Sequence, residues 1–377
     1  MRRHSGEIKI FSLRHRGNDR GEVYKMEVTK DTDMIRCPVC NANLRYSVTE
    51  SGLKCEHCGH VEKIIDDKNR IRRDLTDSVM REHEPWKESA VFKCGLCNAR
   101  TDTNKNEIMN VCPFCGSPNI LKTDELPGVK PDSLIPYKVT RQSALDLFKK
   151  WIRGKIFSPG KCRKRAVAEN INSVFSPTWS FTAKTRNRYD GVLGKDYTVT
   201  RTDSKGNTYT TTETRWFNVS GSIDADYYDV LIPSGKLIPQ KMSKKLEPYP
   251  VSNAVAYRQE YLAGRAAEHY SRDIKTCFSE FEKYIYNDLC QRIKRKHGAD
   301  HIRYMNIDTA YDTKQFNYIL LPNYIANFTY KKKYYNFYVN GATGKVVGRY
   351  PLSAPKILLT IAAIGAAIAG LWYLMGG

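Results

Sequence analysis

Two segments of the chain place apolar residues at helical spacing. In TRQSALDLFKKWI, residues 140–152, apolar side chains recur every three or four positions, and Thr140 can cap the amino end. The same spacing extends over residues 268–297, where Gly298 can end the helix. We therefore expect two amphipathic helices that pack on a larger core. Their apolar residues are Ala144, Leu145, Leu147, Phe148, Trp151 and Ile152 in the first, and Tyr270, Ile274, Cys277, Phe278, Phe281, Tyr284, Ile285, Leu289 and Ile293 in the second.

Alternating patterns typical of strands begin near residue 172 and continue to about 232. Within them, DYTVTRT and TYTTTETRWFNV flank DSKGN, residues 203–207, which predicts a hairpin. Four short strand patterns follow as far as Tyr350, and the last two turn at NGATG. Together with the helices, these patterns predict an α+β domain over residues 130–352, with a twisted antiparallel sheet. The proline-rich segment LPGVKPDSLIPY, residues 126–137, marks its start.

A continuous apolar segment occupies residues 357–375 and contains no charged residue. As a helix it would extend about 28 Å, close to the ~30 Å hydrocarbon core of a bilayer. A buried helix of a globular protein is the alternative, but a helix that is apolar on all sides is difficult to bury elsewhere. We predict a transmembrane tail anchor. Because Lys345, Arg349 and Lys356 precede the segment, the positive-inside rule places most of the chain in the cytosol.

The charge of the chain suggests an anionic partner. Its 377 residues include 61 Lys and Arg against 40 Asp and Glu, a net charge of +21. Nucleic acid and an acidic membrane surface both fit this charge. The first residues contain no apolar run of signal-peptide length, so the 11 cysteines are expected in a reducing compartment, where metal binding is more common than disulfides.

Eight of the cysteines form two copies of one pattern, C-x2-C-x14-C-x2-C, separated by 57 residues. They are Cys37, Cys40, Cys55, Cys58, Cys94, Cys97, Cys112 and Cys115. Two C-x-x-C turns joined by a hairpin supply four thiolates to a tetrahedral zinc ion, the arrangement of a zinc ribbon. We predict a ribbon in residues 34–63 and another in residues 91–121, with two structural zinc ions in total. A charged linker, 64–90, separates the ribbons, and a basic flexible arm, 1–33, precedes them.

The residue after each pair supports this interpretation. Asn41, Gly59, Asn98 and Gly116 stand where a metal knuckle bends the backbone into the left-handed region, which Gly and Asn tolerate best. A redox C-x-x-C would need a thioredoxin-like helix start, which neither copy shows. Four thiolates leave no open position for a substrate, so the zinc is expected to be structural and not catalytic.

No catalytic or cofactor-binding residue is predicted. GATGK, residues 341–345, lacks the spacing of a phosphate-binding loop and is expected to be a β-turn. The basic runs RIKRKH, residues 292–297, and YKKKYY, residues 330–335, are expected at a helix end and a hairpin tip. If they bind a ligand, anionic lipid headgroups are favoured by their nearness in sequence to the anchor.

These motifs also support a resemblance to a known family. The duplicated ribbon, LIPYKVTRQSALDLFKKWI, VFSPTWSFTAKTRNRYDG, YLAGRAAEHY and YILLPNYIANFTYKKKYYNFYVNGATGKVVG stand in one chain with a terminal anchor. Over residues 34–375 the chain resembles the YdjG-like family of bacterial zinc-ribbon membrane proteins. Members carry the labels transcription-factor-IIB-type zinc ribbon-containing protein or primosomal protein N′-like. The second label has no support here, because a nucleotide-binding motif is missing.

The resemblance implies a function as well as a fold. It implies that the eight cysteines are zinc ligands and that the protein is held at the cell (inner) membrane with its bulk in the cytoplasm. It also implies a scaffold in a membrane-integrity complex, with a partner such as an SPFH or phage-shock-protein-A-like protein. We therefore expect a non-enzymatic adaptor. A membrane-tethered nucleic-acid-binding protein is the alternative, and an enzyme with an unrecognised site is a third hypothesis.

Overall fold

Three very long strands form the centre of the fold. They are β9 (Glu169–Thr202), β10 (Thr208–Pro233) and β13 (His301–Tyr330). The computed structural model describes residues 35–64, 71–81, 89–95, 99–104, 112, 120–123, 129–165, 169–331 and 333–374. The predicted arm, 1–33, lies outside these residues. Strand β9 pairs with β10 along one edge and with β13 along the other.

Shorter strands extend this arrangement to a 12-stranded sheet. Its other strands are β4 (Arg73–Asp74), β5 (Ser89–Cys94), β6 (Arg100–Asn104), β7 (Ile120–Thr123), β8 (Ser133–Leu134), β11 (Val255–Ala256), β12 (Ala266–Glu268), β14 (Lys333–Asn340) and β15 (Val346–Gly348). Most neighbours are antiparallel, as predicted, but β12 pairs in parallel with β9 and β8 with β13. The sheet is therefore mixed.

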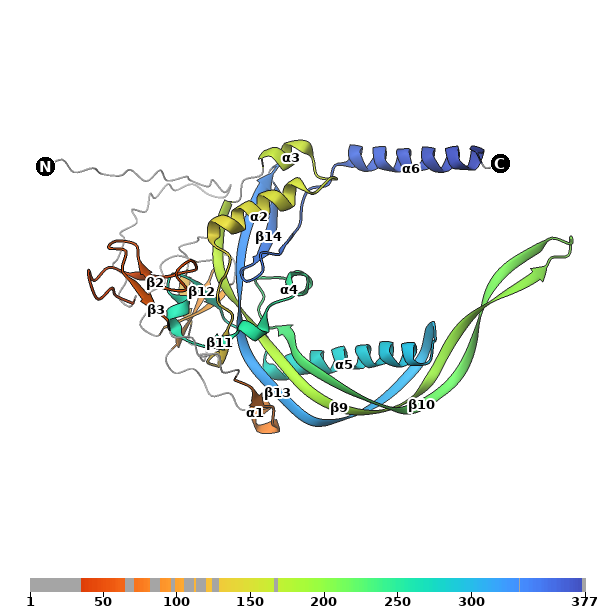
Figure 1. The fold of residues 1–377 in the computed structure, drawn as a ribbon, viewed down its shortest axis with the longest axis horizontal. Coiled ribbons are helices and arrows are strands. Elements are labelled where there is room, and N and C mark those ends of the chain that lie inside the picture. The colour runs from red at the N-terminus through yellow and green to blue at the C-terminus, as the bar shows by residue number, and fades with distance from the viewer. Residues whose placement is uncertain are drawn as a thin grey trace. The chain divides into compact units, whose positions relative to one another are not determined.

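A second sheet and the helices complete the architecture. The small sheet contains β1 (Leu44–Ser47), β2 (Gly52–Cys55) and β3 (Val61–Lys63). The helices are α1 (Asp77–Arg81), α2 (Arg141–Arg153), α3 (Gly160–Arg165), α4 (Gln240–Leu246), α5 (Ile274–Lys296) and α6 (Ala354–Leu374), with 3-10 turns η1 (Val251–Asn253) and η2 (Gln259–Leu262). The described part of the chain is thus α+β, as expected (Figure 1).

The predicted hairpin is confirmed. Its strands are β9 and β10, and the turn lies at residues 203–207. The Asp203 carboxylate accepts hydrogen bonds from the backbone N–H of Lys205 at 2.8 Å and of Asn207 at 2.9 Å, and Gly206 takes a left-handed φ of 85°. These are the local bonds by which an Asp closes a turn.

The sequence predicts four short strands before Tyr350, and this prediction is wrong for the first part of the segment. Residues 301–330 form one strand, and only β14 and β15 are short. Register shifts interrupt the pairing of β13 with β9 at Ile302/Tyr304, Tyr311/Thr313 and Ile325/Asn327. A bulge reverses the inward and outward alternation without ending the strand. The alternation of apolar and polar residues is therefore interrupted in the sequence at positions where strand β13 continues.

Helix α5 covers one face of the three long strands (Figure 1). Its buried residues are Ile274, Cys277, Phe278, Phe281, Ile285, Leu289, Cys290 and Ile293. The helix begins at Ile274, capped by Asp273, and not at 268 as predicted, because Glu268 is the last residue of β12. Gly298 takes a left-handed φ of 58° after its last turn, as expected.

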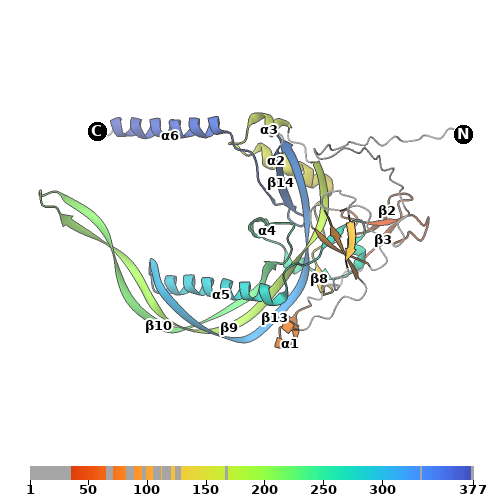
Figure 2. The ribbon, with the colours of Figure 1, turned by 180° about the vertical axis from the view of Figure 1, so that it is seen from behind.

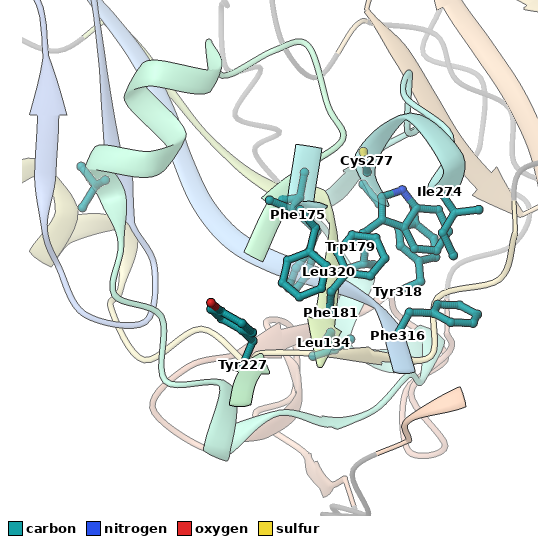
Figure 3. Packing of buried hydrophobic residues seen from close by; sticks show 14 of the residues in the cluster. Leu134, Phe175, Trp179, Phe181, Tyr227, Ile274, Cys277, Phe316, Tyr318 and Leu320 are labelled. Carbon is teal, nitrogen blue, oxygen red and sulfur yellow. The ribbon is translucent and has the colours of Figure 1, made fainter. Parts of the chain in front are cut away.

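Aromatic side chains from β9, β13 and α5 form the core beneath this helix (Figure 3). Phe181 stacks on Phe281 with ring centroids 5.3 Å apart, and Trp179 packs 4.7 Å from Tyr318. The indole N–H of Trp179 donates to the Arg272 carbonyl at 3.2 Å. Burying large rings whose polar atoms keep a hydrogen bond stabilises a fixed register between the strands and the helix.

Part of the predicted charged linker, 64–90, belongs to the sheet. Strand β4 pairs with β13, and Leu75 is buried while its N–H donates to the Lys314 carbonyl at 2.8 Å. Arg72 also reaches Asp229 on β10 at 2.9 Å. Asp229 lies at the bulge of β10 with a φ of 50°. Residues 71–81 are therefore attached to the long strands.

Candidate metal centre

Four thiols meet at the tip of the small sheet. Cys37 and Cys40 precede β1, Cys55 ends β2 and Cys58 follows it. Their four sulfur atoms all lie within 4.8 Å of one another. The structure thus brings together the four ligands that the sequence predicts for the first module. The nearby His57 and His60 are not part of the cluster.

The separations fit a metal ion and not a disulfide. The Sγ atoms of Cys37 and Cys58 are 3.5 Å apart, as are those of Cys40 and Cys55. A disulfide needs about 2.05 Å. A tetrahedron with zinc–sulfur bonds of ~2.3 Å places its sulfur atoms about 3.8 Å apart. The cluster therefore has the geometry of a metal site, and four thiolates favour zinc.

Both C-x-x-C turns have the backbone that the sequence predicts. Asn41 and Gly59 take left-handed φ values of 58° and 77°. The Asn41 N–H donates to the Cys37 carbonyl at 2.9 Å, and the Gly59 N–H donates to the Cys55 carbonyl at 3.0 Å. This geometry turns each pair of sulfur atoms toward the other pair.

The electrostatics of the cluster also favour a cation. Backbone N–H groups of Cys58 and His57 lower the pKa of the Cys55 thiol to about 6. The Ala42 backbone lowers the pKa of Cys40, but desolvation and the neighbouring thiols outweigh it and raise that pKa to about 12. Ionisation of the first thiol, Cys55, is thus favoured, and ionisation of a further thiol beside it is unfavourable. A divalent cation removes this penalty, which couples metal binding to proton release.

The first cysteine module, residues 34–63, is fastened to the rest of the fold. The Tyr46 N–H donates to the Ala263 carbonyl at 3.2 Å, and Arg265 donates to the Tyr46 carbonyl at 3.0 Å. The Arg265 guanidinium also lies between the rings of Tyr46 and Tyr137, 4.9 Å and 4.7 Å from their centroids. The module that contains the metal site therefore packs on the loop that follows η2, residues 263–265.

The second cysteine module, residues 91–121, is described in part. Cys94 and Cys112 are buried and pack with Ala99. The Cys94 N–H donates to the Ala99 carbonyl at 2.9 Å, which repeats the 2.8 Å bond from Cys37 to Ala42 at the 57-residue offset. The predicted ligands Cys97 and Cys115, with Asn98 and Gly116, lie outside the described residues. Unlike the first module, this one joins the large sheet through β6 and β12.

A buried carboxyl beside the second module was not predicted from the sequence. Glu268 on β12 accepts hydrogen bonds from the backbone N–H of Lys236 at 2.5 Å and of Leu237 at 2.8 Å, and Leu237 packs against the buried cluster that contains Cys94. Its other oxygen has no hydrogen-bond partner among the residues that the structure describes. Desolvation raises the pKa of Glu268 to about 7. A single glutamate in YLAGRAAEHY gives no sequence signal for this burial.

This raised pKa predicts a pH-dependent stability. The contribution of Glu268 is fully present below its ordinary pKa of about 4.5 and is lost as pH rises through about 7. Glu268→Gln cannot ionise, so between pH 5 and pH 8 it should lose about 2 to 3 kcal/mol less stability than the wild type. Thermal unfolding of the detergent-solubilised chain at several pH values measures this, with exposed Glu282→Gln as control. The same pH dependence in all three proteins would contradict the assignment.

Comparisons with known proteins give one match to the first cysteine module and one to most of the chain. The family model described as Trm112p-like protein matches residues 32–66, which include the first four cysteines. The chain is also similar to the uncharacterized protein YdjG of Bacillus subtilis (strain 168), with 26% identity over 332 residues, 85% of this chain and 91% of YdjG. No solved structure matches. The similarity to YdjG thus extends far beyond the cysteine modules.

Proposed function

We propose that the protein is a non-enzymatic scaffold, anchored by α6 at the cytoplasmic face of the cell membrane. One observation carries the anchor. The helical segment Ala354–Trp372 is long and apolar enough to cross a membrane, and none of it is buried in the fold (Figures 1 and 2). A core helix of a soluble protein would bury one face. A bilayer is the environment that removes such a surface from water.

Two structural zinc ions belong to this proposal. The first ion is supported by the four-sulfur cluster, and the second by the repeated backbone bond at Cys94. Thiolates that fill all four positions leave no coordination site for a substrate. The ions would therefore hold the modules folded and present their surfaces to a partner.

A free strand edge favours a protein partner. Among the described strands, β10 pairs with β9 alone, so the edge that faces away from β9 is unpaired along 26 residues. An open edge can accept a strand from another protein, with backbone hydrogen bonds providing affinity. Nucleic acid has no β-strand backbone to add to this edge, so strand pairing favours a protein partner over nucleic acid. The family resemblance implies an SPFH or phage-shock-protein-A-like partner.

Photo-crosslinking in the native cell tests this function. A photoreactive amino acid at exposed Asn218 or Ser220 of β10 should capture an SPFH or phage-shock-protein-A-like protein in the membrane fraction. The same group at exposed Glu282 on α5 serves as the control position. Recovery of nucleic acid alone from the β10 positions would overturn the scaffold in favour of the membrane-tethered nucleic-acid-binding alternative.

A further inference from the structure

Basic side chains gather at the base of α6 from a distant part of the chain. Helices α2 and α3 lie beside the start of α6 in both views (Figures 1 and 2). Residues 141–165 contain nine Lys and Arg against a single acidic residue, Asp146. We call this segment the basic platform. Its exposed cations include Lys150 and Arg153 near the end of α2 and Lys161 in α3.

Direct contacts fasten the platform to the anchor helix. The Lys356 ammonium donates to the carbonyls of Ile156 at 3.0 Å and Ser158 at 2.7 Å, across about 200 residues of sequence. The Ser353 N–H donates to the Phe157 carbonyl at 2.8 Å. The lysine that precedes the apolar segment thus binds the platform, and the membrane-facing charge must come from elsewhere.

Among the described side chains of the platform, most charges are uncompensated. Asp146 pairs with Lys149 at 3.3 Å. Within the described part of the chain, Lys150, Arg153 and Lys161 form no salt bridge. A cluster of unpaired cations is costly to hold together unless an anionic surface lies opposite.

Two apolar side chains project at the same place. Ile156, in the loop between α2 and α3, is 66% exposed, and Leu352, just before α6, is 61% exposed. Cations next to exposed aliphatic residues are typical of segments that lie in the membrane interface. Nucleic acid would use the cations but leave these apolar groups in water.

The aromatic residues of the platform are not arranged for base stacking. Trp151 is half-buried and packs edge-on against Tyr350 with ring centroids 5.9 Å apart. The Lys155 ammonium lies 4.9 Å from the Trp151 ring centroid and 5.6 Å from that of Tyr350. Single-strand binding surfaces instead leave ring faces open to bases.

We infer that the basic platform lies on an anionic phospholipid surface, at the leaflet where α6 enters the bilayer. Lys150, Arg153 and Lys161 contact lipid phosphates, while Ile156 and Leu352 insert at the boundary of the acyl chains. This inference rests on the proposed anchoring by α6. Each cation near an anionic leaflet strengthens the contact about fivefold, so three together give a factor on the order of 100.

Hydrogen exchange of the full-length chain in vesicles tests the platform. Peptides from residues 141–165 should exchange at least about tenfold more slowly in phosphatidylcholine vesicles that contain phosphatidylglycerol than in pure phosphatidylcholine. High salt should remove the difference, because surface contacts are screened. The triple variant Lys150→Gln, Arg153→Gln, Lys161→Gln should lose the difference at low salt.

The matched control has the same change of charge elsewhere. Lys205→Gln, Lys275→Gln, Lys283→Gln replaces three exposed lysines of the hairpin turn and α5, and it should keep the lipid-dependent protection. Equal exchange in both vesicle types, or equal loss in both triple variants, would overturn the platform. So would protection that appears only when an RNA or DNA oligonucleotide is added.

A separate measurement distinguishes the platform from the anchor. Vesicle flotation after an alkaline wash reports whether α6 is inserted. A chain that is washed off refutes the anchoring and the platform with it. A chain that floats with the vesicles but exchanges alike in both lipids refutes the platform alone.

Discussion

Replacing Cys37 with serine will release one zinc ion per chain and unfold the first cysteine module, while the long strands remain folded. The module has only residues 34–63, too few to bury a core of its own. Binding of a structural zinc ion contributes about 10 to 16 kcal/mol in modules of this size. Loss of one thiolate therefore removes most of what keeps β1 and β2 paired.

Zinc content and hydrogen exchange measure this result. The wild type should contain two zinc ions, and the Cys37→Ser and Cys94→Ser variants one each. Strands β1 and β2 should lose protection in Cys37→Ser alone. Cys162→Ser is a matched control, since Cys162 is buried but lies outside the metal cluster. Unchanged zinc content in Cys37→Ser would contradict the metal site, and a wild type with one ion would contradict the second.

Two arginines in the middle of α6 will release the protein from membranes. Ile364 and Ile368 are 56% and 63% exposed in the fold, so Ile364→Arg with Ile368→Arg disturbs no internal packing. Each arginine at the centre of a membrane helix costs about 2.5 to 3.5 kcal/mol of insertion free energy. The double variant should therefore move to the soluble fraction in a folded state.

Fractionation of cells, with an alkaline wash of the membranes, measures this release. The variant Ile364→Leu with Ile368→Leu keeps the apolar surface and should remain in the membrane fraction. If the arginine variant still resists the alkaline wash, α6 is not the anchor. If it leaves the membrane but aggregates, the expectation that the rest of the chain folds without the anchor is contradicted.

Local elements were predicted well where one short-range signal dominates. Helix α2 begins after Thr140, whose side chain accepts from the Ser143 N–H at 3.1 Å, as the sequence indicates. The turn at 203–207 and the left-handed Asn41 and Gly59 also follow from neighbours in the chain. Each depends on contacts within about five residues, which a sequence pattern records directly.

Long-range pairing explains the errors. Thr185 and Asn187 of β9 are polar but buried, and their side chains donate to the carbonyls of Ala225 and Ile223 on β10, which no local pattern indicates. Strand β13 was divided into short runs because its bulges change which side chains face α5. Residues 266–268 have helical composition but pair with β6 and β9. Pairing with a strand already present stabilises them more than local helix propensity.

The sequence by itself determined the cysteine pattern from which the metal ligands are predicted, and the apolar segment, because repeated C-x-x-C spacing and an uncharged run of membrane length are local chemical patterns. Only the tertiary structure decided what surrounds them. It placed four sulfur atoms within 4.8 Å, buried the carboxyl of Glu268 and brought the basic platform to Lys356. These features join segments as far as about 200 residues apart. No short-range pattern specifies them, since they arise from pairing of the long strands and from burial in a shared core.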